Sequence, residues 1–157
     1  MDPASIDETV DYISIVRLQR AYADAVNRRA WADFVELFRP DARIEIDTVT
    51  RPVFEVVGPA EFATFVGGAT ERFGFFEFVI LNPHIELWVD GDHDAASARI
   101  FMQEVRVDLT GSRTDAYGMY RDSYRRIDGR WWITARTYRS LTRTPGFEVF
   151  PTPDYSL

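Results

Sequence analysis

A chain of 157 residues is long enough for one domain with a single hydrophobic core. Its formal net charge of −7 argues against a nucleic-acid partner, because phosphate contacts require clustered Lys and Arg, and the absence of cysteine excludes disulfides and thiol nucleophiles. The two histidines lack a metal-binding spacing and no apolar run is long enough to span a membrane, so we expect no metal, no cofactor, no membrane partner and a cytoplasmic location.

The N-terminal third predicts two helices followed by a strand. Ser5 followed by Glu8 is a capping-box pattern that opens the first helix, and apolar residues recur at helical spacing as far as Tyr22. A second, short helix is expected over residues 31–38, ended by a proline. Residues 42–47 then alternate between apolar and acidic side chains, which is typical of a strand with one buried face.

The middle of the chain predicts a short strand, a third helix and an apolar run. The strand covers residues 53–57, and Gly58-Pro59 starts the helix with a proline at a position that the first turn tolerates. The apolar run covers residues 75–81, and turn residues at 90–94 follow it.

The C-terminal half predicts long strands at 95–109, 117–127 and 131–141. Asp128-Gly129 joins the last two and is the strongest hairpin signal in the chain. Helices first and antiparallel hairpins afterwards indicate an α+β fold rather than a parallel βαβ sheet. We expect one domain over residues 1–157, with 144–157 lying across the body as a flap.

Four stretches resemble the nuclear-transport-factor-two-like superfamily, and specifically its SnoaL-like branch: AYADAVNRRAW, LFRPDARIE, WVDGDHDAASA and YRDSYRRIDGRWWI. The resemblance implies a strongly curved antiparallel sheet wrapped around N-terminal helices, that is, a cone-shaped, cystatin-like α+β barrel with one open mouth. It also implies a homodimer or higher homo-oligomer. This fold hosts dehydratases, isomerases, hydrolases and pure binding proteins, so it does not by itself define a reaction.

The resemblance assigns pocket positions to two residues of the first helix. Tyr22 matches the pocket tyrosine of ketosteroid isomerases and bile-acid dehydratases, where a phenol donates a hydrogen bond to a carbonyl or a developing oxyanion. Packing alone, with the hydroxyl satisfied, is the alternative. Asn27 falls where the dehydratases usually carry an aspartate and is a candidate for substrate binding, although Asn also suits the end of a helix.

Two titratable residues are candidates for moving a proton. The pKa of histidine suits proton abstraction by His84 if its side chain faces inward, although the base of the family's dehydratases aligns a few residues earlier. Glu104 aligns with the aspartate that pairs with that base, and apolar neighbours would raise its pKa. The alternatives are a histidine at a rim or interface and an exposed glutamate paired with an arginine.

Ile100 and Met102 share a strand face with Glu104 and are assigned to the substrate pocket, as is Tyr120, which aligns with a polar pocket residue of scytalone-dehydratase-like members. Arg106-Val107-Asp108 resembles the Arg-x-Asp pair of limonene epoxide hydrolases, but the second aspartate of that site is missing from the final strand. The arginines of YRRIDGR and ARTYRS are expected at a solvated, ion-paired sheet edge.

These residues support two functions. The first is a cofactor-independent lyase or isomerase of dehydratase type, in which Tyr22 stabilises an enolate-like oxygen and His84 or Glu104 moves the proton. Its partner is a small hydrophobic cyclic substrate in an apolar pocket. The alternative is a non-catalytic small-molecule-binding or assembly module, similar to the β-subunit of a ring-hydroxylating dioxygenase.

Overall fold

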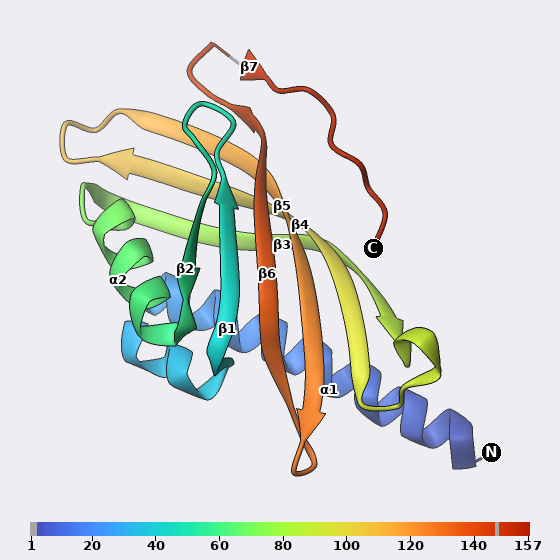
Figure 1. Ribbon diagram of the computed structural model, residues 1–157. Coiled ribbons are helices and arrows are strands. Elements are labelled where there is room, and N and C mark those ends of the chain that lie inside the picture. The colour runs from blue at the N-terminus through green and yellow to red at the C-terminus, as the bar shows by residue number, and fades with distance from the viewer. Residues whose placement is uncertain (1–2, 147) are drawn as a thin grey trace.

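A long N-terminal helix, α1 (Pro3–Arg28), lies across one face of a curved sheet in the computed structural model, which describes residues 3–146 and 148–157 (Figure 1). The remaining elements follow in chain order: η1 (Trp31–Glu36), β1 (Phe38–Asp47), β2 (Phe54–Val57), α2 (Gly58–Thr70), β3 (Phe73–Leu87), η2 (Val89–Gly91), β4 (Ala95–Asp108), β5 (Arg113–Ile127), β6 (Arg130–Arg143) and β7 (Glu148–Val149). No helix among the described residues combines the length and the apolar character needed to cross a membrane.

The strands form one sheet in the order β2-β1-β6-β5-β4-β3, and β7 pairs with β6. Every pairing is antiparallel except that of β1 with β6, which is parallel. The α+β class and the curved antiparallel sheet are therefore confirmed. The sheet does not close into a barrel, because β2 and β3 form its two ends and α2 connects them (Figure 1).

The concave face of the sheet and α1 enclose the core. Alternate residues of β4 point inward, so that Ala96, Ala98, Ile100 and Met102 are at most 3% exposed. An aromatic cluster joins the helices to the sheet through Tyr22, Phe34, Phe38, Phe62 and Phe78.

Two expectations at the N-terminal end are wrong. The helix already begins at Pro3, so Ser5 lies inside its first turns, where its carbonyl accepts a hydrogen bond from Thr9 Oγ1 at 2.8 Å, and no capping box opens the helix at Ser5. The second helix is a 3₁₀ turn that ends at Glu36. Pro40 lies inside β1, at a register shift of the β1–β6 pairing where the ladder requires no donor from it.

The turn at Asp128-Gly129 is confirmed as the β5–β6 hairpin. Both residues have positive φ, 52° and 76°, which is the conformation of a two-residue turn whose twist matches that of the strands. The predicted strand at 117–127 begins earlier, at Arg113, and the apolar run at 75–81 is the middle of β3.

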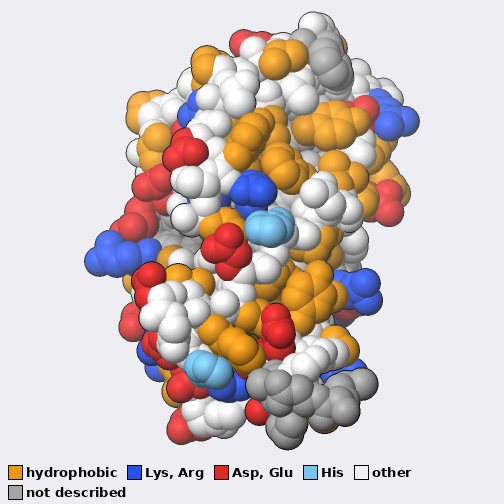
Figure 2. All heavy atoms as spheres, turned by 90° about the vertical axis from the view of Figure 1, so that its right-hand side faces the viewer, with side chains coloured by type: hydrophobic (Ala, Val, Ile, Leu, Met, Phe, Trp, Pro, Cys, Tyr) orange, Lys and Arg blue, Asp and Glu red, His pale blue; other side chains and the backbone are white. Residues whose placement is uncertain are grey.

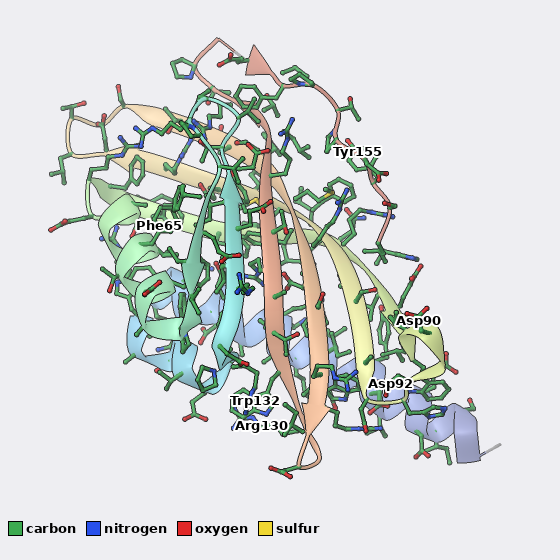
Figure 3. All side chains as sticks on the ribbon, viewed as in Figure 1. Phe65, Asp90, Asp92, Arg130, Trp132 and Tyr155 are labelled. Atoms are coloured by element: carbon green, nitrogen blue, oxygen red, sulfur yellow. The ribbon has the colours of Figure 1, made fainter. Side chains whose placement is uncertain are left out.

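The C-terminal tail lies over the outer face of the sheet. Phe150 is buried, and Tyr155 contacts Phe101 of β4 with ring centroids 5.8 Å apart (Figure 3). Arg99 of β4 and Arg121 of β5 donate hydrogen bonds to the tail carbonyls of Tyr155 and Asp154. Apolar side chains gather on this side of the molecule (Figure 2).

Gly118 tests how tightly the concave face is packed. A Cβ at this position would lie 2.5 Å from the Tyr138 ring and 2.9 Å from Met102 Sδ, so Gly118→Ala should lower the free energy of unfolding by about 1–3 kcal/mol. Gly68→Ala in α2 is the control, because its Cβ meets no atom within 4 Å and should stabilise the helix by up to about 1 kcal/mol. Urea unfolding of both variants measures the difference, and equal effects would contradict this packing.

Candidate functional site

A cavity of about 250 Å³ lies between the concave face of the sheet and the two α-helices. Aromatic rings from α1, α2, β3, β5 and β6 form much of its apolar lining. Phe65 of α2 closes one side and contacts Phe54 of β2 with ring centroids 5.1 Å apart (Figure 3). Nine of the lining residues are polar or charged: Thr48, Thr50, Arg51, Thr70, Arg72, Glu104, Arg106, Arg136 and Arg143.

Arg136 of β6 lies at the floor of the cavity, with 1% of its side chain exposed. Its Nε and Nη2 donate to the two carboxylate oxygens of Asp122 at 2.8 and 2.6 Å, so the pair is bidentate. Asp122 also accepts a hydrogen bond from the Tyr124 hydroxyl at 2.9 Å, which in turn accepts one from Gln19 of α1 at 3.0 Å. The remaining nitrogen of Arg136, Nη1, is buried and has no partner among the described residues.

Two tyrosine rings enclose the Arg136 guanidinium. Its central carbon lies 4.1 Å from the ring centroid of Tyr22 and 4.1 Å from that of Tyr120. Burial lowers the pKa of Arg136, but the Asp122 carboxylate and the neighbouring phenols outweigh burial and raise it, so the guanidinium stays charged. The floor of the cavity therefore holds a permanent cation whose charge is balanced by Asp122.

Tyr22 and Tyr120 present neutral hydroxyls to the cavity. Burial raises the pKa of both phenols, so neither ionises near neutral pH. Their oxygens are 3.4 Å apart, and a single contact between two hydroxyls uses only one of their two protons. The other proton is available to an acceptor in the cavity.

Glu104 of β4 is the one acidic residue that lines the cavity among those described. Burial raises the pKa of this carboxyl, and Arg106 and Arg143 partly oppose the shift. Its nearest cationic atom is Arg106 Nη1, at 3.6 Å. Burial, followed by the charge of Glu104, raises the pKa of the Tyr138 phenol to about 12. A carboxyl group with a raised pKa beside neutral phenols is an arrangement suited to proton transfer.

The cavity brings together three of the residues that the sequence selects: Tyr22, Glu104 and Tyr120. The structure places four others elsewhere. Ile100 and Met102 are fully buried core residues that do not line the cavity. Asn27 exchanges two hydrogen bonds with the Phe78 backbone, at 3.0 and 2.6 Å, and so fastens the end of α1 to β3.

His84 does not reach the cavity, which corrects the expectation that it faces inward. It pairs with Arg99 of β4 on the outer face, and its side chain is 57% exposed beside Glu86. The register explains this position, because its neighbour Pro83 lies opposite the inward-facing Ile100. No cluster of three or more metal-binding side chains occurs among the described residues.

Sequence reasoning missed Arg136, which it placed at a solvated sheet edge. The hairpin register changes near its middle: Tyr124 pairs with Ile133, but Ser123 pairs with Ala135, so one residue of β6 is extra. This bulge turns Arg136 inward, opposite Asp122. The available signal was Asp122 itself, since an acid alternating with two tyrosines on a buried strand face requires a cationic partner.

Removing one member of the buried pair should strongly destabilise the protein. Asp122→Ala leaves the Arg136 charge buried without compensation and should cost about 3–5 kcal/mol of unfolding free energy. Glu55→Ala is the control, because it breaks the exposed pair with Arg43 (2.8 Å) and should cost at most about 1 kcal/mol. Chemical unfolding measures both, and similar losses would show that the buried pair has no special role.

Glu104 should make stability depend on pH. Because its folded-state pKa is raised, the stability that its protonated form contributes is present at low pH and is lost as pH rises through the folded-state pKa. Glu104→Gln should therefore raise the melting temperature above that of the wild type near neutral pH, and this advantage should shrink at about pH 4. Thermal unfolding across this range measures the effect. A difference that does not depend on pH would show that the pKa of Glu104 is not raised in the folded state.

Comparisons with known proteins agree with this architecture. The family model described as "SnoaL-like domain" matches residues 7–137. No curated protein matches the sequence.

Solved structures from Novosphingobium share the fold. A protein provisionally assigned as scytalone dehydratase, from Novosphingobium aromaticivorans, is 19% identical over 89% of this chain and 90% of that chain, with a TM-score of 0.75. Hexachlorocyclohexane dehydrochlorinase LinA-type3, from Novosphingobium barchaimii, is 17% identical over 95% and 99%, with a TM-score of 0.77. An NTF2-like protein with a cystatin-like fold from Novosphingobium aromaticivorans is 18% identical over 88% and 86%, with a TM-score of 0.71. Because the family model covers most of the sequence, the chain belongs to the SnoaL-like domain family.

Proposed function

We propose that this protein is a cofactor-independent lyase or isomerase of dehydratase type that acts on a small cyclic carbonyl compound. One observation carries the proposal: Glu104, the cavity's acidic residue, shares the cavity with the neutral hydroxyls of Tyr22 and Tyr120 and with Arg136 Nη1, which has no partner among the described residues. Proton removal next to a carbonyl requires a base and donors that stabilise the resulting oxyanion, and these groups supply both.

The reaction follows from these roles. The Glu104 carboxylate removes a proton from the carbon next to the carbonyl, the electron pair of that C–H bond forms a carbon–carbon double bond, and the carbonyl π pair moves to the oxygen, which becomes an enolate oxyanion. A tyrosine hydroxyl and Arg136 Nη1 donate hydrogen bonds to the oxyanion. In a dehydration the carbonyl re-forms, the β-hydroxyl leaves, and the proton held by Glu104 converts it to water. In an isomerisation Glu104 returns the proton to a different carbon.

Two features favour Glu104 over His84 as the proton carrier. Burial makes its carboxylate more basic than an exposed glutamate, whereas His84 lies on the outer face of the sheet.

The names of the structural neighbours, a dehydratase and a dehydrochlorinase, both denote eliminations, although at below 25% identity they support the fold alone.

Turnover of 3-hydroxycyclohexanone to the conjugated enone, followed by ultraviolet absorbance, tests the proposal. Glu104→Gln should lower kcat by at least about 100-fold, because it removes the base. Tyr22→Phe should lower kcat by about 10–100-fold with a smaller change in KM, since it removes one donor and leaves the ring against Arg136. In the wild type kcat/KM should rise with pH as Glu104 deprotonates, with a midpoint above the usual glutamate value of 4.5.

His84→Gln distinguishes the two proton carriers and should leave the rate and its pH profile unchanged. Equal rates for wild type, Glu104→Gln and Tyr22→Phe would refute catalysis by this site. If the ligand still bound to all three proteins, a non-catalytic binding or assembly role would replace the enzymatic one.

A further inference from the structure

Three arginines, Arg72, Arg106 and Arg143, form what we call the arginine rim of the cavity. They come from the segment after α2, from β4 and from the end of β6. All three line both the main cavity and an adjoining hollow of about 310 Å³, so they lie where the two spaces meet. This concentration of positive charge is notable in a chain whose net charge is −7.

The rim is under-neutralised. Arg106 Nη1 lies 3.6 Å from Glu104, whereas Arg72 and Arg143 have no carboxylate within 4 Å among the described residues. Asp108 also lines the adjoining hollow, but its Oδ1 accepts hydrogen bonds from Thr110 and Ser112 of its own turn. Two carboxylates, Glu104 and Asp108, thus face three guanidinium groups, which leaves an excess of positive charge at the rim.

The rim also has unused hydrogen-bond donors. The Nε atoms of Arg106 and Arg143 are buried and have no partner among the described residues. A buried donor of a charged group without an acceptor costs free energy, which a bound acceptor would recover. An anionic oxygen satisfies both the charge and the donors.

Aromatic rings hold the rim in place. The Phe73 ring centroid lies 4.9 Å from the guanidinium carbon of Arg72 and 5.5 Å from that of Arg106. Arg143 lies 5.9 Å from the ring of Phe150 in the C-terminal tail. A guanidinium that contacts a ring keeps N–H groups on its edge for a planar, two-oxygen acceptor.

We propose that the physiological ligand of this cavity is a carboxylate: its ring lies against the aromatic wall, and its anionic group binds between Arg106 and Arg143. As a statement about the substrate, this inference rests on the proposed function; as a statement about binding, it does not. The charge of Arg136 is balanced by Asp122, so the floor suits a neutral carbonyl while the rim suits the anion.

Matched pairs of small ring acids and their primary amides test the inference by isothermal titration calorimetry. The probes are benzoate, cyclohexanecarboxylate and 3-oxocyclohexanecarboxylate, each against its uncharged amide of similar shape. At least one acid should bind about 10-fold more tightly than its amide at low salt. Arg106→Gln and Arg143→Gln should each remove most of this preference and leave amide affinity within about 2-fold. Glu104→Gln should increase acid affinity, because it removes the competing charge.

Arg130→Gln is the matched control. It removes the same charge at an exposed position outside the cavity, 3.1 Å from Glu36, and should leave the preference intact. If the rim variants fold poorly, the wild type alone decides: acid affinity should fall with added salt while amide affinity stays constant. The inference is wrong if no acid binds more tightly than its amide. It is also wrong if the preference for the acid is the same in the rim variants as in the wild type and does not change with added salt.

The same probes separate this inference from the proposed reaction. Exchange of the α-protons of 3-oxocyclohexanecarboxylate in deuterated water, followed by NMR, reports proton transfer independently of affinity. A preference for the acid without catalysed exchange would uphold the ligand class and refute the reaction. Catalysed exchange that is equal for acid and amide, with equal affinities, would uphold the reaction and refute the ligand class.

Discussion

The buried ion pair between Arg136 and Asp122 is the interaction on which the site depends. A charged guanidinium without a partner is too costly to bury, so Arg136 occupies the floor of the cavity only because Asp122 binds it through two hydrogen bonds. Once there, the guanidinium packs against the rings of both Tyr22 and Tyr120, which also contact each other edge to face. Gln19 extends the network to α1 through Tyr124, so the helix and the sheet meet at a defined position. Arg136 Nη1, which has no partner among the described residues, is then available to a hydrogen-bond acceptor in the cavity.

Charge is divided within the cavity. At the floor, Asp122 balances Arg136, and the phenols stay neutral because burial raises their pKa. At the rim, three guanidinium groups outnumber the carboxylates of Glu104 and Asp108, and burial raises the pKa of Glu104. This division is the basis of the two proposals: Glu104 exchanges protons with a bound molecule, and the rim binds the anionic group of that molecule. The overall negative charge of the protein does not describe the local field that a ligand meets.

Sequence patterns identified the elements well where local chemistry decides the structure. Asp128-Gly129 specifies its hairpin because both residues accept positive φ. The alternation in β4 placed Glu104 on the same face as Ile100 and Met102, and helical periodicity placed Tyr22 on the buried side of α1. The prediction that Arg136 lies at a solvated sheet edge failed because one extra residue in β6 changes the register of the β5–β6 pairing.

The sequence by itself determined the α+β class, the hairpin at Asp128-Gly129 and the presence of a phenol and a carboxyl on inward faces, because these depend on periodicity and turn chemistry within short segments. The family was indicated by the resemblance of four stretches of the sequence to known members. Only the tertiary structure decided which side chains meet. The bulge in β6 brought Arg136 inward, and the pairing of β3 with β4 sent His84 outward, since strand side chains alternate and a shift of one residue reverses the face. The meeting of Arg106 with Arg143 likewise required strands that are distant in sequence to end at the same mouth.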